Sequence, residues 1–247
     1  MRTRLQKTFV LLTFALHGQL SAKNICEESL GYVNSEFYQY FHELIPSRFG
    51  KFGRTRFFRS MLLPLVERSM ALREISEVYE QGKADRSPVC FGERCNRVLN
   101  IRGALNRDAI ARIPRTGPLL VVARHPFGIA DGFVLLEFLK RIRPDAKLMA
   151  SNIVDALSET REDFLLVDVH GKSDSDAKRS NGQQLLKILR HWTKNQGTLL
   201  AFPAGQVARV RGAQIGGDAL ERPWNSELFN LALRSKATIV PIYIDGQ

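Results

Sequence analysis

Cysteine is scarce in this 247-residue sequence. The three cysteines, Cys26, Cys90 and Cys95, are an odd number and include no Cys-x-x-Cys pair. This pattern indicates neither a cysteine-ligated zinc site nor a disulfide framework. We predict no bound metal. Acids are outnumbered as well: 36 lysines and arginines against 25 aspartates and glutamates leave a net charge of +11. This charge predicts an acidic partner, such as nucleic acid, an anionic membrane face or a phosphorylated substrate.

Several cofactor and catalytic motifs are missing. The sequence contains no Gly-x-Gly-x-x-Gly dinucleotide fingerprint, no Gly-x-Ser-x-Gly nucleophile elbow and no internal repeat. Gly171-Lys172-Ser173 follows an apolar run as a phosphate-binding P-loop would, but that motif requires a glycine five residues earlier, where Leu166 stands. The common nucleotide-binding and serine-hydrolase patterns are therefore excluded.

A long hydrophobic run is also absent from the N-terminal region. Residues 1–24 combine basic residues with an apolar run from Phe9 to Leu16, shorter than the ~20 apolar residues that span a bilayer. The same pattern is the shape of a secretory signal, although Leu20 is a poor residue two before a cleavage at Ala22. We predict an N-terminal apolar anchor or signal-like segment over residues 1–24, with both interpretations open.

Residues 25–85 lack strand signals, so we predict a helical segment. Residues 46–59 interleave five cations with four phenylalanines and contain no acid. This pattern suits single-stranded nucleic acid, but apolar residues continue past it and no nucleic-acid-binding signature follows. We therefore expect an anionic membrane surface and no nucleic acid as partner, with a solvated loop before a core helix as the plainer alternative. The polar stretch from Gln81 to Ser87 marks the expected boundary with a domain over residues 86–247.

Strands and helices alternate through residues 86–247. This alternation, with apolar strands, predicts an α/β fold: a mostly parallel central sheet covered by helices on both faces. The predicted strands are 119–123, 147–151, 164–169, 198–202 and 238–244, with a short one within 90–101. The predicted helices are 133–142, 185–192 and 227–235, with short ones at 103–113 and 153–159.

Chemistry is expected where the strand at 119–123 ends. His125 follows that strand, and Asp131 lies in the first turn of the helix that begins after a Pro/Gly break. Open α/β sheets bind ligands at the carboxyl ends of their strands. A His and an Asp six residues apart across a tight turn can meet, so that the carboxylate fixes the imidazole tautomer and stabilises its cation. The plainer alternative is a loop histidine followed by a helix-capping aspartate.

A second predicted strand, 198–202, ends in a similar Pro/Gly turn. Backbone N–H groups near Gly205 and the cation of Arg209, just beyond the turn, suit a phosphate or a carboxylate. The alternative is an ordinary turn that ends a strand.

Three motifs in series resemble those of the glycerolipid/lysophospholipid acyltransferase superfamily. The segments His125–Asp131, Phe202–Gln206 and Ile239–Pro241 resemble, in order, its His-x4-Asp, Phe-Pro-Glu-Gly-Thr and Val-Pro blocks. The spacing from His125 to Asp131 is one residue longer than His-x4-Asp, a departure that the hemolysin-like branch shares. The closest variant is the hemolysin-like (ornithine-lipid-type) bacterial branch, in which the first block reads His-Pro-x-Gly-x-x-Asp-Gly and the second Phe-Pro-Ala-Gly-Glu. The similarity extends from about Asn100 to Gln247.

The resemblance implies an acyltransferase of phospholipid biosynthesis, membrane-associated at the cytoplasmic face of the inner or plasma membrane. It would move a fatty acyl group from acyl-CoA or acyl carrier protein, a thioester co-substrate rather than a cofactor, to a lysophospholipid or related lipid acceptor. His125 would be the general base, oriented by Asp131, with no acyl-enzyme intermediate. The residues implied to line the acceptor pocket are Phe202, Pro203, Ala204, Gly205, Gln206 and Arg209.

Departures from the family pattern leave open an alternative, a catalytically silent relative that binds lipid or membrane. Arg124 stands where the family usually has Asn, which places a cation next to the proposed base. Gln206 replaces the glutamate of the hemolysin-like branch and removes a charge. The sequence stops at Gln247 directly after the last expected strand, so we expect a domain truncated at its C-terminal end.

Overall fold

The computed structural model describes residues 35–103, 110–151, 154, 158–167, 174–210, 219–224 and 226–244. The predicted anchor or signal-like segment, residues 1–24, lies outside them. The chain divides into two compact units, residues 1–100 and 101–247. The boundary expected near residue 85 falls inside the first unit, and the proposed domains 25–85 and 86–247 stay a prediction.

The first unit is helical over the residues that are described, as the lack of strand signals predicted. Ser35 caps the first helix by accepting a hydrogen bond from the Tyr38 N–H at 3.4 Å. Aromatic rings pack between the helices: Tyr79 stacks on Phe37 and meets the edge of Phe91. The helices are α2 (Glu36–Arg48), α3 (Gly50–Gly53), the π-helix η2 (Phe58–Leu62), α4 (Leu63–Ser69), α5 (Leu72–Ala84) and α6 (Phe91–Val98).

The short strand expected within residues 90–101 is wrong, because α6 occupies this stretch. Phe91 and Cys95 recur at helical spacing and are both buried, so the helical period outweighs the strand signals. α6 packs closely on α5 because Gly82 has no side chain there: a Cβ at Gly82 would lie 2.8 Å from Cys95 Sγ.

The second unit is built on a five-stranded sheet in which every pair of neighbours is parallel. In spatial order the strands are β3 (Phe164–Val167), β2 (Lys147–Ser151), β4 (Thr198–Ala201), β1 (Leu119–Ala123) and β7 (Thr238–Ile242). Every residue of β1 and β4 is buried, which explains their continuous apolar sequences. Pro241 is tolerated because β7 is an edge strand, which can lack one backbone donor.

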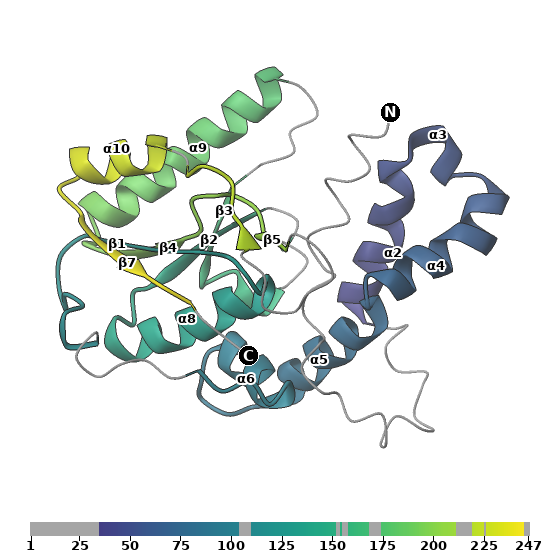
Figure 1. The fold of residues 1–247 in the computed structure, drawn as a ribbon, viewed down its shortest axis with the longest axis horizontal. Coiled ribbons are helices and arrows are strands. Elements are labelled where there is room, and N and C mark those ends of the chain that lie inside the picture. The colour runs from purple at the N-terminus through teal and green to yellow at the C-terminus, as the bar shows by residue number, and fades with distance from the viewer. Residues whose placement is uncertain are drawn as a thin grey trace. The chain divides into compact units, whose positions relative to one another are not determined.

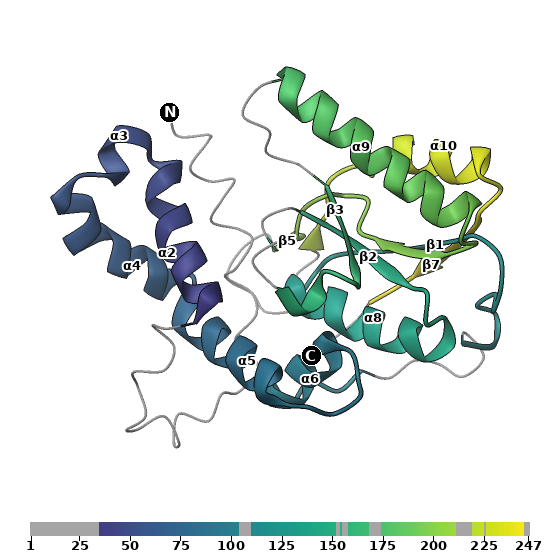
Figure 2. The same ribbon diagram turned by 180° about the vertical axis from the view of Figure 1, so that it is seen from behind.

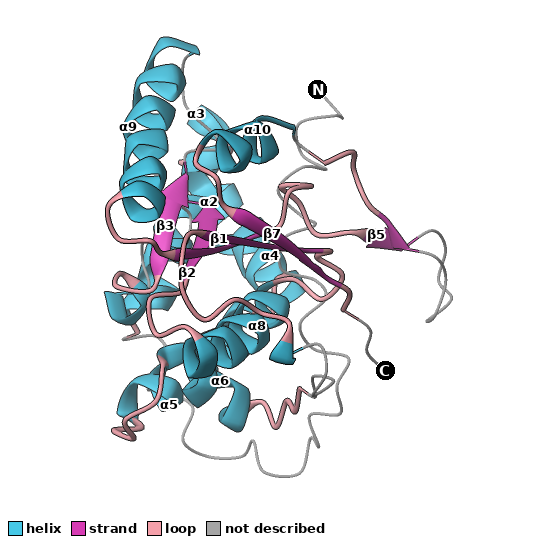
Figure 3. Cartoon of the chain, turned by 90° about the vertical axis from the view of Figure 1, so that its left-hand side faces the viewer, coloured by secondary structure: helices cyan, strands magenta, loops and turns pink. Residues whose placement is uncertain are grey.

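Helices cover both faces of this sheet, so the predicted α/β fold is confirmed. Figures 1 and 3 show α8 (Ile129–Ile142) on one face and α9 (Asp174–Thr193) with α10 (Ser226–Arg234) on the other. From behind, α9 and α10 again lie together on one side of the sheet (Figure 2). Leu120, Trp192 and Leu199 belong to the core on that side. A small antiparallel pair, β5 (Arg209–Val210) and β6 (Ala219–Leu220), follows β4.

The helix boundaries differ from the sequence-based expectations in several places. α9 begins at Asp174, well before Leu185, where its apolar periodicity starts. The helices expected at 103–113 and 153–159 lie partly outside the described residues, which include the 3-10 helix η4 (Ser158–Thr160). Among the helices that are described, none combines the length and the apolar character needed to cross a membrane.

Arg143 joins the loops that precede β1 and β4. Its side chain is only 3% exposed and donates hydrogen bonds of 2.8–3.0 Å to the carbonyls of Pro114, Gly117 and Gln196. It also donates to both carboxylate oxygens of Asp145 at 2.9 Å. Burial raises the pKa of Asp145, but the hydrogen bond and charge of Arg143 outweigh burial and hold that pKa below its ordinary value. These bonds satisfy loop carbonyls and fix the amino-terminal edge of the sheet.

Candidate active site

The strands that carry the two main motifs, β1 and β4, are neighbours in the sheet. The chain leaves β1 towards α8 on one face, and after β4 its next helix, α10, lies on the other face (Figure 3). Such a switch in direction is where α/β proteins bind ligands, at the carboxyl ends of the two strands. His125 follows β1 and Phe202 follows β4, so both motifs meet at this edge.

Gly128 shapes the turn between His125 and α8. Its φ of +69° and ψ of −133° form a backbone conformation that glycine adopts and residues with a side chain avoid. The Asp131 N–H donates to the Gly128 carbonyl at 3.1 Å, which closes the first turn of the helix. Asp131 therefore lies one turn above the loop, as the sequence predicted.

The structure brings His125 and Asp131 together. His125 Nδ1 lies 3.0 Å from Asp131 Oδ2, and the same oxygen accepts the Phe127 N–H at 2.8 Å. An ionised carboxylate can only accept hydrogen bonds, so Nδ1 carries a hydrogen and Nε2 keeps the lone pair of the neutral ring. The Asp131 side chain is 2% exposed and that of His125 is 16% exposed. This is the arrangement of an imidazole base held by a buried carboxylate.

Phe202 covers one face of the His125 ring. The ring centroids are 4.0 Å apart and the planes are 15° from parallel. Gly132 of α8 lies close to the sheet: a Cβ there would lie 2.9 Å from Leu148 Cδ2, whereas Phe202 Cε2, at 3.8 Å, would be in ordinary contact. The loops after β1 and β4 are also joined through the backbone, because the Ala208 N–H donates to the His125 carbonyl at 2.8 Å. The two sequence motifs therefore form one site.

The second motif folds as a tight turn. The Gly205 N–H donates to the Phe202 carbonyl at 2.9 Å, and Gly205 has a φ of +64°. Pro203 and Ala204 are buried, Gly205 is exposed and Gln206 is half-buried. The Gly205 N–H is already engaged by the Phe202 carbonyl. An anion at this turn would therefore have to be bound by the backbone N–H groups that follow Gly205. Within the described part of the chain, the Gln206 N–H has no hydrogen-bond acceptor.

Two arginines flank the site. Arg209 begins β5, where it pairs with Leu220 of β6, but its side chain lies outside the part that is described and its binding role stays a prediction. Arg124 places its Nε 3.7 Å from Glu221 Oε2 and its guanidinium 5.8 Å from the centre of the Tyr243 ring. Arg124, the cation that precedes the proposed base in the sequence, is therefore paired with the Glu221 carboxylate. Sequence patterns missed Glu221, because it meets Arg124 only in the folded unit.

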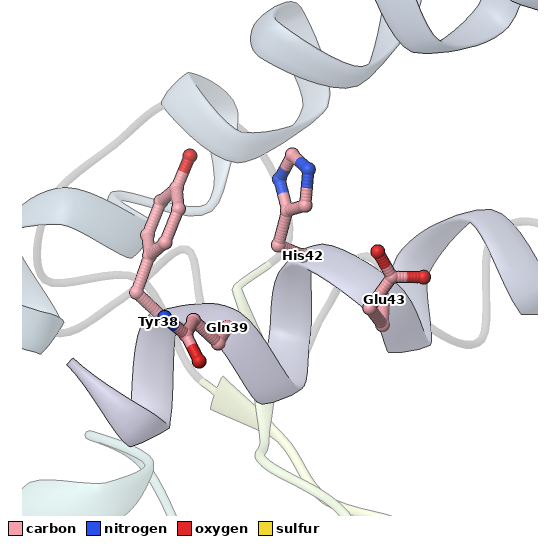
Figure 4. A pocket seen from close by; sticks show the side chains of 4 residues that line it. All are labelled: Tyr38, Gln39, His42 and Glu43. Carbon is pink, nitrogen blue, oxygen red and sulfur yellow. The ribbon is translucent and has the colours of Figure 1, made fainter. Parts of the chain in front are cut away.

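A second histidine–carboxylate pair, which the sequence analysis missed, lies in the first unit. Figure 4 shows Tyr38 and His42 leaving α2 on the same side, beside an open hollow that is also lined by Gln39 and Glu43. His42 Nδ1 is 2.6 Å from Glu67 Oε1, and the Tyr38 hydroxyl donates to Glu67 Oε2 at 3.1 Å. The four-residue spacing of Tyr38 and His42 is the signal that could have found it. Glu67 belongs to α4, so the pair links two helices.

The described residues contain no recognisable metal-binding cluster. Across residues 35–244, leaving aside the gaps in the description, no three His, Cys, Asp or Glu side chains are grouped as metal ligands would be. The site that the structure does assemble consists of His125, Asp131 and the turn from Phe202 to Gln206.

The comparison with known families matches this site. A family model described as acyltransferase matches residues 53–247, which include both motifs and most of the chain. No protein of curated function is similar enough in sequence to be matched. The family match extends over far more than half of the residues, and the chain belongs to an acyltransferase family.

Proposed function

We propose that this acyltransferase moves a fatty acyl group from the thioester of acyl-CoA or acyl carrier protein to a lysophospholipid or related lipid acceptor. The observation that carries the proposal is the His125–Asp131 pair, at 3.0 Å, at the end of β1. The segment His125–Gly132 reads His-Pro-x-Gly-x-x-Asp-Gly, which supports the hemolysin-like branch within the wider family. The reaction belongs to phospholipid biosynthesis and takes place at the cytoplasmic face of a membrane, where both donors are available.

His125 is the general base of this reaction. Its Nε2 takes the proton from the acceptor hydroxyl or amine as the oxygen or nitrogen attacks the thioester carbonyl carbon. The new carbon–oxygen or carbon–nitrogen bond forms, the carbon–sulfur bond breaks, and the proton passes from Nε2 to the departing thiolate. Asp131 stabilises the imidazolium that exists between these two proton transfers.

Direct attack by the acceptor is the simplest scheme for this site. Within the described part of the chain, His125 has no hydrogen bond to a serine or cysteine that could form an acyl-enzyme. General-base help contributes about 10²–10⁴-fold, so orientation of the two substrates and stabilisation of the oxyanion must supply the rest of the acceleration.

The turn after β4 lines the acceptor pocket in this proposal. Phe202 sets the tilt of the His125 ring, and the buried Pro203 and Ala204 hold the turn in place. The Gln206 N–H and the Arg209 cation are suited to the phosphate or carboxylate of the acceptor. The neutral Gln206 side chain, in place of a glutamate, avoids repelling an anionic headgroup.

The test is acyl transfer by the purified protein. Labelled acyl-CoA and labelled acyl carrier protein are each offered with a panel of lysophospholipids and aminoacyl lipids that have a free hydroxyl or amine. We expect one acceptor class to become labelled with wild-type protein and not with His125→Ala. Labelling no greater with wild-type than with His125→Ala, for every donor and acceptor, would overturn the proposal. Lipid binding without turnover would then favour a catalytically silent relative.

A further inference from the structure

The helices α3, η2 and α4 of the first unit leave large apolar side chains in solvent. Phe52, Phe57, Met61 and Leu65 are 49%, 58%, 60% and 63% exposed. The last three recur every fourth residue, so they form one row that begins one residue before η2 and continues into α4. We call Phe57, Met61 and Leu65 the outer apolar row; Phe52 is exposed on α3. A soluble surface rarely keeps such a contiguous group uncovered unless it binds something.

The apolar residues that the first unit needs for its own core lie elsewhere on the same helices. Phe58 and Leu63 are each 1% exposed, and the Phe58 ring packs against those of Phe49 and Phe52. The outer apolar row is therefore additional to the core, and solvent-facing positions would normally carry polar residues.

The helix that carries this row is continuous from η2 into α4, although α4 contains a proline. Pro64 lacks an N–H and would interrupt an ordinary helix. The π-helical turn of η2 accommodates it, and the Leu63 N–H donates to the Phe58 carbonyl five residues back. α3 packs closely against α2 because Gly53 has no side chain. A Cβ at Gly53 would lie only 2.0 Å from the Pro46 carbonyl oxygen.

Positive charge gathers in the segment that leads into the outer apolar row. No acid occurs between Glu43 and Glu67, whereas five cations do. Arg59 pairs with Glu43 at 3.2 Å. The other four cations are exposed and form no ion pair with any residue that is described: Arg48, Lys51, Arg54 and Arg56.

We propose that the α3–η2–α4 face docks on the surface of an anionic lipid bilayer. The outer apolar row enters the boundary between headgroups and acyl chains, and the four unpaired cations contact lipid phosphates. Charge complementarity carries this assignment, because the chain between Glu43 and Glu67 carries cations and no acid. A second copy of the same face would repel this face, whereas the phosphates of an anionic bilayer attract it. Single-stranded nucleic acid would use the phenylalanine rings for stacking, but it gives no role to Met61 and Leu65.

Docking on lipid does not depend on the proposed acyl transfer. Vesicle binding requires neither an acyl donor nor the His125–Asp131 pair, so its result stands whether or not the protein turns over. Conversely, acyl transfer to a soluble acceptor in detergent would test the active site without a membrane surface.

The experiment is co-sedimentation of the purified protein with vesicles of phosphatidylcholine, alone or mixed with phosphatidylglycerol. The test variants are a triple, Phe57→Ser with Met61→Ser and Leu65→Ser, and a double, Arg54→Glu with Arg56→Glu. The matched control replaces three leucines of the second unit that are 45–66% exposed: Leu185→Ser, Leu186→Ser and Leu233→Ser.

We expect wild-type and control protein to bind mixed vesicles and the two test variants to bind them at least about tenfold more weakly. Circular dichroism checks that the exposed substitutions leave the helices intact. The proposal is overturned by equal binding of wild-type and both test variants, by equal loss in the control, or by wild-type binding that ignores phosphatidylglycerol. Tighter binding to oligonucleotides than to mixed vesicles, or a dimer that the triple variant dissolves, would also overturn it.

Discussion

The His125 ring is fixed from three directions. Asp131 accepts from Nδ1, Phe202 covers one face of the ring, and the Ala208 N–H holds the backbone carbonyl. A base must keep its lone pair aimed at one point to be effective, and a displacement of about 1 Å can cost as much as 10²-fold in rate. The packing around His125 therefore matters as much as its chemistry.

Asp131→Asn should preserve the fold and remove most of the activity. The amide oxygen can still accept the Phe127 N–H, which lies 2.8 Å from the present carboxylate oxygen. The neutral amide no longer stabilises an imidazolium, so we expect kcat to fall by about 10²–10⁴-fold. Steady-state kinetics measure the fall, and circular dichroism confirms folding. Activity within about tenfold of wild-type would mean that the pair is structural.

Phe202→Leu should have a smaller effect on the same reaction. Leucine keeps an apolar side chain but loses the stacked ring, which lies 4.0 Å from the imidazole. Stacked pairs contribute about 0.5–1.5 kcal/mol, so we expect kcat/KM to fall by about two- to tenfold. The His125 Nδ1 resonance in NMR spectra should still report a hydrogen bond to Asp131. A loss as large as that of Asp131→Asn would show that Phe202 does more than hold the ring.

Sequence spacing predicted the meeting of His125 with Asp131 because one turn and one helix start separate them. It could not predict the stacking of Phe202 on His125, because that contact depends on β4 being the neighbour of β1. The partner of Arg124, Glu221, was missed for the same reason. Contacts between residues close in the sequence can be predicted from their spacing. Contacts between residues on different strands can be predicted only when the order of the strands in the sheet is known.

At the scale of single elements, the end of α9 shows how close packing overrides a simple rule. Gly197 looks like a helix-ending glycine, but Gln196 takes the left-handed conformation, with a φ of +52°. The Gly197 N–H donates to the His191 carbonyl at 2.9 Å. Gly197 is needed for another reason: a Cβ there would lie 2.2 Å from the His191 ring.

Gly197→Ala should therefore destabilise the protein. The His191 ring is buried and its Nε2 is 3.0 Å from the Thr198 carbonyl, so the ring cannot move aside without losing that contact. We expect the free energy of unfolding to fall by about 1–3 kcal/mol in denaturant titrations. Gly182→Ala is the matched control, because that α9 glycine has open space around it and alanine favours a helix. Equal effects of the two substitutions would contradict the packing explanation.

At the scale of the whole molecule, stability should fall on acidification. Burial lowers the pKa of His191 below 6.5, outweighing its hydrogen bond to the Thr198 carbonyl. As the pH falls below 6.5, His191 binds a proton in the unfolded chain but stays neutral in the folded chain. The free energy of unfolding therefore decreases, until the pH falls below the pKa of His191 in the folded chain. The pKa of Asp145 is also lowered in the folded chain. This group therefore reduces the free energy of unfolding further only when the pH falls below 3.8, its ordinary pKa.

The measurement is denaturant unfolding at about pH 7.5 and about pH 5.5, a window in which histidines titrate. His191→Gln should be less stable than wild-type at the higher pH but should lose less stability between the two. The same loss in both proteins would show that other groups cause the acid sensitivity.

The architecture of the second unit was predictable only in part. Continuous apolar runs identified β1 and β4 as buried strands, and alternation with helices identified the parallel sheet. The spatial order, with β4 placed between β2 and β1, could not be read from the sequence, because it depends on which strands each crossover passes. That order creates the switch point at which the two motifs meet.

The most direct test of the account compares two histidines that each hold a carboxylate. His125 pairs with Asp131 at the strand ends, and His42 pairs with Glu67 between two helices. His125→Gln and His42→Gln are assayed side by side for transfer of a labelled acyl group to the best acceptor. We expect His125→Gln to lose about 10²–10⁴-fold in kcat and His42→Gln to keep wild-type turnover. Equal turnover in the two variants would contradict the assignment of His125 as the base.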